Sequence, residues 1–409
     1  MTIFEFLFGG LFSAVAATGS SAPFVLAFVT GWIFWHFWVL YVQQLSISNE
    51  AMILLEVRLP KELTKSPRAM EIILNAFAQR SPSNWYAAYY EGKVRAYSSL
   101  EIVSEGGKVK FYIYIRKGMK NLVEAQIYAQ YPEVEVHEVD DYTRAVPYGA
   151  PGAQYELWGS EYKLAKEDAY PIKTYIDYGL DKDPKEEFKI DPLTSVIETL
   201  GSIGQGEYIW FQMIIMATDP YPPRPGSHGL KSWKDQGKEL IEKLSKRDQA
   251  KVLKPGEVPD FVKAQLTPRE KDMLESVERN LSKTAFDVGM RCLYIARKEK
   301  FNRGMTGALG GLLSPFATGD LNSFKGTRGT SVDYPWQDPF GVKVAKRKRN
   351  LFEAYCKRGY FYYPYTRKPF VLSAEEIATI YHFPGMVAET PTLGRIESKR
   401  GEAPVNLPI

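Results

Sequence analysis

The N-terminus is an apolar stretch that carries no Asp, Glu, Lys or Arg from Phe6 to Asn49. Within it, Phe24–Val42 is dense in Phe, Trp, Val and Leu. As a helix this segment would span about 28 Å, close to the hydrocarbon thickness of a bilayer. The shorter apolar stretch 3–17 contains two glycines and is either an interfacial helix or the first arm of a hairpin. We therefore predict a membrane anchor over 1–49, with Phe24–Val42 as its transmembrane helix.

A cleaved signal peptide is the competing interpretation, because Ala14-Val15-Ala16 resembles a small-residue cleavage site. The N-terminus has no Lys or Arg, however, and the apolar run continues far past that site. Basic residues first appear after the span, at Arg58, Lys61, Lys65 and Arg68. The positive-inside bias then predicts a protein of the cell's inner (cytoplasmic) membrane, with the bulk of the chain in the cytoplasm.

Residues 50–150 alternate between strand-like and helix-like hydrophobic patterns. A helix should follow Ser66-Pro67, and a second one should bury Leu122 against core residues such as Ile113. Pro132 ends this second helix. Strands are expected at 52–60, 97–104, 109–115 and 134–137, with a tight hairpin at Glu105-Gly106-Gly107. The resulting β-α-β-β-α-β order predicts a ferredoxin-like unit.

Residues 151–340 follow a looser version of the same plan, so the predicted fold class is α+β with two ferredoxin-like units. A capping box at Thr267–Glu270 marks the start of one helix. We expect residues 219–265, which are rich in proline and then in charge, to be a helical insertion into this unit. Strands are predicted at 172–178, 207–218 and 286–297, and helices at 191–200 and 267–283.

Residues 341–409 combine a basic and aromatic segment, a short helix and an extended tail. Nine Lys or Arg residues lie between Gly341 and Lys368, against the single acidic residue Glu353. Cations interleaved with aromatic rings suit nucleic-acid backbones and stacked bases, but the simpler interpretation is a strand that is solvated or faces lipid headgroups. The candidate contacts are Lys346, Arg347, Lys348, Arg349, Tyr355 and Tyr360. A second capping box, at Ser373–Glu376, begins the short helix.

Composition adds little to this picture: the mean hydropathy is −0.27 and the net charge is +4. No lysine lies in the G-x-x-x-x-G-K-[ST] pattern that holds nucleotide phosphates. The four histidines and two cysteines are scattered without metal-ligand spacing, and Asp140-Asp141 is typical of a solvated turn. We expect no cofactor, no metal site and no catalysis, although an unrecognised membrane enzyme remains a third hypothesis.

Two segments resemble the N-terminal, non-motor region of ATPases from conjugation and type IV secretion. They are FYIYIRKGMKNLVEAQIYAQYPEVEVHEVDDYT at 111–143 and FVLSAEEIATIYHFPG at 370–385, and the tail 390–408 resembles the stretch that leads into the motor. The likeness extends over roughly residues 50–408. In that family a Walker-containing motor follows, but this chain ends at Ile409, so its nucleotide-binding residues have no counterpart here.

The resemblance implies a membrane-anchored scaffold or docking subunit, itself no enzyme, for a separate cytoplasmic Walker-type ATPase. It also implies a homo-oligomer. Apolar residues of the short helix would dock this partner, unless the helix packs on its own domain; they are Ile377, Ile380, Tyr381 and Phe383. The alternative function is a membrane-tethered module that binds nucleic acid in a DNA-transfer machine.

Overall fold

The computed structural model forms two compact units, one of residues 1–50 and 81–94 and one of residues 51–80 and 95–409. Each unit is described by itself. The residues that the structure describes are 22–60, 63, 65–79, 84–149, 154–181, 190–218, 233–245, 267–327, 329–332, 334–385 and 395–396.

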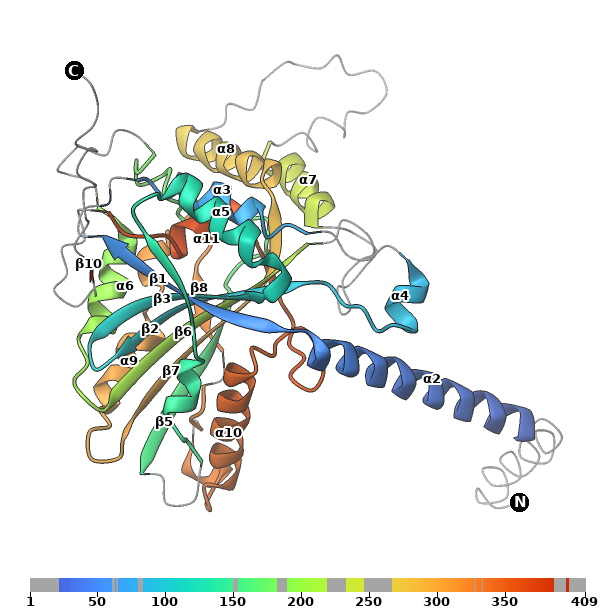
Figure 1. The fold of residues 1–409 in the computed structure, drawn as a ribbon. Coiled ribbons are helices and arrows are strands. Elements are labelled where there is room, and N and C mark those ends of the chain that lie inside the picture. The colour runs from blue at the N-terminus through green and yellow to red at the C-terminus, as the bar shows by residue number, and fades with distance from the viewer. Residues whose placement is uncertain are drawn as a thin grey trace, which may run out of the picture. The chain divides into compact units, whose positions relative to one another are not determined.

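The first unit contains the long helix α2 (Ala22–Asn49) and the short helix α4 (Trp85–Tyr89) (Figure 1). The stretch Val25–Asn49 has a mean hydropathy of 1.7 and is long and apolar enough to cross a membrane. Only 6% of its most apolar window is buried. By its length and composition, this helix near the N-terminus could be either a membrane anchor or a signal sequence. The predicted helix at Phe24–Val42 lies within α2, whereas stretch 3–17 lies outside the described residues.

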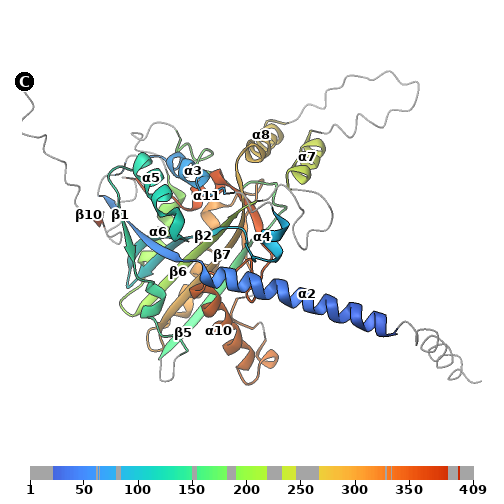
Figure 2. The ribbon, with the colours of Figure 1, turned by 45° about the vertical axis from the view of Figure 1, so that its right-hand side comes forward.

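The second unit is built on one large sheet (Figures 1 and 2). In the part of the chain that the structure describes, nine strands form an antiparallel sheet, and β10 (Arg395–Ile396) pairs in parallel with the end of the first strand. The antiparallel strands are β1 (Met52–Pro60), β2 (Tyr97–Glu105), β3 (Lys108–Arg116), β4 (Glu135–Val139), β5 (Tyr155–Leu164), β6 (Glu207–Ala217), β7 (Ala285–Arg297), β8 (Phe324–Gly326) and β9 (Phe370–Ser373).

Strands from both predicted units share this sheet. The pairings run β4-β1-β3-β2 in the first half and β6-β7-β5-β8 in the second, and β9 pairs with β7. The halves join where β2 pairs with β6, from Tyr97 opposite Met216 to Glu105 opposite Tyr208. The predicted hairpin connects β2 and β3, with φ of 57° at Gly106 and 88° at Gly107. Positive φ at both turn residues suits a two-residue hairpin loop.

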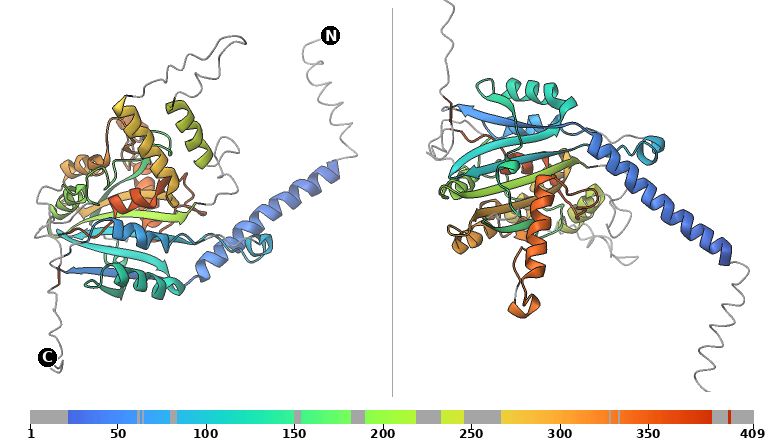
Figure 3. Two further views of the ribbon diagram at one scale, coloured as in Figure 1. Left: turned by 90° about the horizontal axis from the view of Figure 1, so that it is seen from above. Right: turned by 60° about the horizontal axis from the view of Figure 1, so that its bottom comes forward.

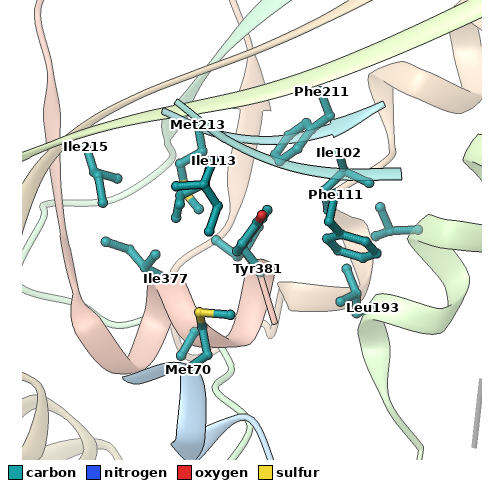
Figure 4. Packing of buried hydrophobic residues seen from close by; sticks show 14 of the residues in the cluster. Met70, Ile102, Phe111, Ile113, Leu193, Phe211, Met213, Ile215, Ile377 and Tyr381 are labelled. Atoms are coloured by element: carbon teal, nitrogen blue, oxygen red, sulfur yellow. The ribbon is translucent and has the colours of Figure 1, made fainter. Parts of the chain in front are cut away.

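The largest core lies between one face of the sheet and a layer of helices (Figure 4). Ile377 and Tyr381 point from the helical layer toward Ile113 and Met213 of the strands, with Met70 behind them. The helices that contribute to this core are α3 (Arg68–Asn75), α5 (Lys120–Gln130), α6 (Pro192–Gly201), α9 (Arg303–Gly310) and α11 (Ala374–Ile380).

The predicted helical insertion is described only in part. Residues 233–245 contain α7 (Trp233–Leu244), which packs against α8 (Pro268–Ser282) through Leu240 and Val277. The rest of 219–265 lies outside the described residues. Helix α8 begins at the predicted capping box, in which the Thr267 side chain accepts from the Glu270 N–H and Glu270 accepts from the Thr267 N–H.

Two local predictions are wrong, and one strand was not predicted. Residues 172–174 are irregular and 175–178 form a turn instead of a strand; the N–H groups of Ile172 and Tyr175 donate to Glu376 and to the Thr379 hydroxyl of the helical layer instead of to a neighbouring strand. Strand β5 was not predicted, because Gly159 and charged residues interrupt its apolar alternation. Leu122 is 43% exposed, because α5 turns Val123 and Ile127 toward the core instead.

The corrected face of α5 predicts unequal effects of two truncations. Ile127→Ala should lower the free energy of unfolding by about 2–5 kcal/mol, because Ile127 is fully buried and its loss leaves a cavity. Leu122→Ala, on the same helix, should cost less than about 1 kcal/mol. Chemical denaturation of the two variants checks this, and equal losses would contradict the assigned face.

Candidate functional site

Helix α10 (Val342–Cys356) contains the four basic candidates Lys346–Arg349. The sequence predicted a basic and aromatic segment here but no helix. The helix contains neither glycine nor proline, and its first turn is well defined. Gly341 precedes it with φ of 70°, a conformation that favours glycine. The Asp338 carboxylate accepts from the Val344 N–H at 2.8 Å. Backbone N–H groups of this turn hold the pKa of Asp338 below its ordinary value.

The C-terminal half of α10 packs on the second face of the sheet, whereas its N-terminal end points away from the sheet (Figure 3). The Trp210 ring lies 5.3 Å from Tyr355 and 6.1 Å from Phe352, measured between ring centroids. Tyr355 is fully buried and Tyr360 is 4% exposed. These two predicted base-stacking residues are therefore core residues, and their assignment to a surface contact is corrected.

A row of polar side chains crosses the sheet beneath the end of α10. Glu101 of β2 lies opposite Gln212 of β6, which lies opposite Arg291 of β7, which lies opposite Glu161 of β5. Gln212 donates to Glu101 at 2.7 Å and accepts from Arg291 at 2.7 Å. Burial lowers the pKa of Arg291 to about 10. Charge-assisted hydrogen bonds, which are stronger than neutral ones, link this row across β2, β6 and β7.

Arg358, just after α10, completes this network. Its guanidinium donates to Glu101 at 3.0 and 3.2 Å and to Asp141, and both Arg358 and Glu101 are almost fully buried. Its backbone has φ of 49°, the only positive φ of a non-glycine residue in the described chain. A non-glycine residue persists in this conformation only where its surroundings fix it. The ion network therefore clamps the end of α10 to β2.

The electrostatics of Glu101 favour its ionised form. Burial alone would raise the pKa of this carboxyl, but the charge of Arg358 and hydrogen bonds from Arg358, Ser99 and Tyr142 outweigh it. The pKa of Glu101 consequently lies below its ordinary value. Tyr142 donates to Glu101 at 2.8 Å, and its hydroxyl also lies 2.8 Å from that of Tyr355. Every oxygen of this buried carboxylate thus has a partner, as a buried charge requires.

The N-terminal half of α10 is exposed and basic. Lys346, Arg347 and Arg349 are exposed, as predicted for surface contacts, whereas Lys348 is half-buried and pairs with Glu156. Arg349 forms an exposed ion pair with Glu353 at 2.9 Å. The residues around the start of the helix were not predicted as part of a site. Four large apolar side chains there are exposed: Tyr334 (52%), Trp336 (72%), Phe340 (89%) and Val342 (66%).

A second group of exposed aromatic residues lies in the first unit, on α4. Asn84 caps this helix by accepting from the Tyr86 N–H at 3.0 Å. The ring of Trp35 on α2 lies 6.0 Å from that of Tyr89 and 6.1 Å from that of Tyr90. The aromatic run WYAAYY at 85–90 was the available signal for this group. Aromatic rings beside an apolar helix are typical of the membrane–water boundary.

The predicted docking residues of α11 lie in the core. Ile377, Tyr381 and Phe383 are fully buried, and Ile380 is 1% exposed. The Phe383 ring packs 5.0 Å from Tyr131 and 5.8 Å from Phe111. These side chains therefore form no exposed docking surface. Of the two alternatives, the structure has the one in which the helix packs on its own domain. The predicted capping box at Ser373–Glu376 is confirmed.

Glu376 provides a pH-dependent test of this core. Burial raises its pKa to about 7, although it accepts hydrogen bonds from Ser373 and Ile172. Because the folded-state pKa lies above the unfolded value, the stabilisation is largest at low pH and is lost as pH rises toward 7. We expect the free energy of unfolding to fall by about 2 kcal/mol between pH 5 and pH 7.5. Glu376→Gln should flatten this dependence, and an unchanged slope in that variant would contradict the assignment.

Comparison with known proteins identifies the family of this chain. No curated protein matches it. A family model described as a domain of unknown function, DUF8128, matches residues 44–395. The match extends from the end of α2 to β10 and includes the whole sheet, α10 and the buried ion network. The chain therefore belongs to the DUF8128 family.

Proposed function

We propose that this protein is a membrane-anchored scaffold or docking subunit for a secretion- or conjugation-type ATPase, with no catalysis of its own. The observation that carries the proposal is the packing of the two segments that resemble such ATPases, 111–143 and 370–385. These segments are far apart in the sequence but contact each other in one core.

The contacts between the two segments are specific. The Phe111 ring lies 5.7 Å from that of Tyr381, and the Tyr381 hydroxyl donates to the Tyr112 carbonyl at 3.0 Å. Phe383 packs on Tyr131, at the end of the helix in the first segment. Unrelated short matches would have no reason to meet in one core. Their packing supports a resemblance to one folded region of the ATPase family.

Membrane anchorage by α2 is the second part of the proposal. The side chains from Val25 to Phe37 are exposed, and this apolar surface is compatible with lipid. The aromatic residues of α4 lie beside Trp35, as expected for an interfacial helix. The basic residues from Arg58 onward favour the cytoplasm for the rest of the chain.

This topology predicts the behaviour of reporters fused after Ile409. A reporter that works only in the cytoplasm should be active, and a reporter that works only on the opposite side of the membrane should be inactive. The reverse result would overturn this topology.

The sheet supports the interpretation that each half is a ferredoxin-like unit. The pairing β4-β1-β3-β2 is the strand order of a β-α-β-β-α-β unit, and β8-β5-β7-β6 repeats it. In the second half α6 and α9 occupy the positions of the two helices, and α7 and α8 are inserted between its second and third strands. We propose that the sheet combines two such units across the β2–β6 pairing.

Nucleic-acid binding is the alternative function, and the exposed cations Lys346, Arg347 and Arg349 are the observation that favours it. The burial of Tyr355 and Tyr360 leaves phosphate contact without the predicted stacking. Binding would then depend steeply on salt. Retention of DNA that vanishes with Lys346→Glu and Arg347→Glu would favour this alternative over the scaffold.

Purification of the tagged full chain from native membranes in mild detergent tests the scaffold proposal. We expect a separate Walker-type ATPase to co-elute and the chain to assemble as a homo-oligomer.

As a comparison, a chain without residues 397–409 keeps every described contact, including the β10 pairing, and should lose the ATPase while remaining in the membrane. Retention of the partner would place docking elsewhere. ATP turnover that survives partner removal and responds to mutations in this chain would overturn the proposal.

A further inference from the structure

The residues 334–342, which we term the aromatic tip, form an ordered projection. Trp336 and Tyr334 stack with their ring centroids 4.6 Å apart and an interplanar angle of 10°. A 3-10 turn at Pro335–Gln337 is closed by the Gln337 N–H, which donates to the Tyr334 carbonyl. Gly341 donates to the Asp338 carbonyl, and the Asp338 carboxylate binds the first turn of α10. The tip is therefore held in place by its own hydrogen bonds.

The tip presents apolar surface that its own fold does not cover. Phe340 is 89% exposed and Trp336 is 72% exposed, and Val342 continues this apolar surface onto the helix. Exposure of single apolar residues is ordinary, but four exposed apolar side chains within residues 334–342, two of them stacked, indicate an interaction site. Tryptophan and tyrosine favour the headgroup boundary of a bilayer, whereas phenylalanine and valine favour its acyl chains. The tip contains side chains of both kinds.

Cations follow the tip within two helical turns. Lys348 and Arg349 pair with glutamates, whereas Lys343, Lys346 and Arg347 form no ion pair among the described residues. Lys343 donates to the Gln337 carbonyl and its charge lies near the Asp338 carboxylate, whereas Arg347 donates to the neutral Ser331 carbonyl. The clamp at Arg358 fixes the far end of the same helix to the sheet. The aromatic tip and these cations therefore belong to one helix and its leading turn, fixed at the far end.

We propose that the aromatic tip inserts into the surface of an anionic lipid bilayer and that Lys343, Lys346 and Arg347 bind its headgroups. The inference rests on the proposed membrane anchorage by α2, which brings a bilayer within reach of the chain. An anionic lipid surface complements both features at once, because it offers negative headgroups above an apolar layer. A nucleic acid would complement the cations but would leave Phe340 and Val342 without an apolar partner.

The test uses the full chain in vesicles and an environment-sensitive apolar fluorescent amino acid in place of Phe340. In phosphatidylcholine vesicles that contain phosphatidylglycerol, the emission of this fluorophore should shift to the blue. A nitroxide attached to the lipid should quench the same emission. Each cation near an anionic surface changes partitioning about fivefold, so Lys346→Glu with Arg347→Glu should lower the ratio of inserted to free tip by at least about 25-fold. The same fluorophore in place of Glu198, an exposed residue of α6, is the control and should not respond.

Three outcomes would overturn the inference. Emission at position 340 that is equal in anionic and zwitterionic vesicles would exclude the proposed lipid specificity. A response to single-stranded DNA in detergent that exceeds the response to anionic lipid would assign the tip to nucleic acid. A shift that depends on protein concentration instead of lipid would assign it to contact between copies of the chain.

Flotation separates the failure of this inference from the failure of the anchorage. Co-flotation with phosphatidylcholine vesicles after washing at high salt and alkaline pH reports on α2 alone. A chain that floats but gives no lipid response at position 340 contradicts only the inference about the tip. A chain that does not float contradicts the anchorage and the inference with it.

Discussion

Replacing Arg358 with alanine should lower the free energy of unfolding by about 3–5 kcal/mol, because the substitution leaves the Glu101 carboxylate buried without its main partner. Glu101 has no solvent exposure and keeps only neutral donors, from Ser99, Gln212 and Tyr142. The alanine variant also removes the guanidinium that lies 4.5 Å from the Tyr114 ring centroid. Thermal and chemical denaturation of the full chain in detergent measures the loss.

Two companion variants give this experiment its controls. Arg349→Ala breaks an exposed ion pair on the same helix and should change stability by less than about 0.5 kcal/mol. Arg358→Met combined with Glu101→Gln removes both charges, and it should recover much of the loss because the Glu101 carboxylate is no longer buried without its main partner. If Arg358→Ala costs no more than Arg349→Ala, the network does not clamp the end of α10.

Phe383→Ala should also lower the free energy of unfolding by about 3–5 kcal/mol, since it removes a fully buried ring from the main core. The neighbouring rings of Tyr131, Phe111 and Tyr381 would line the resulting cavity. Phe340→Ala, which truncates an exposed ring, is the matched control and should leave stability nearly unchanged. Full stability of Phe383→Ala together with loss of a partner would restore Phe383 to the docking role that the sequence suggested.

Local sequence signals predicted the elements whose determinants are adjacent in the chain. The capping boxes at Thr267 and Ser373, the hairpin glycines and the apolar alternation of β3 all depend on residues within a few positions. The helical character of α10 was hard to recognise, because the apolar positions that face the core, the half-buried Leu351 and Phe352 and the buried Tyr355, lie only in its second half.

Long-range contacts explain what the sequence did not predict. Glu101 and Arg358 carry no local pattern that connects them, and only the pairing of β2 with β6 brings the polar row under α10. Ile377 and Phe383 resemble exposed anchors in a short amphipathic helix, yet the strand β9 beside β7 carries that helix into the core. Burial of such residues is decided by topology, which a single sequence leaves open.

The position of β1 has a mechanical consequence. Helix α2 ends at Asn49 and β1 begins at Met52, so any tension on α2 would enter the second unit through this strand. Strand β1 is hydrogen-bonded to β3 on one side and to β4 on the other. Pulling on a strand that is paired on both sides loads two ladders of hydrogen bonds together, whereas an edge strand has only one to resist the pull. A chain tethered in this way would pass force from the bilayer directly into the middle of its first four strands.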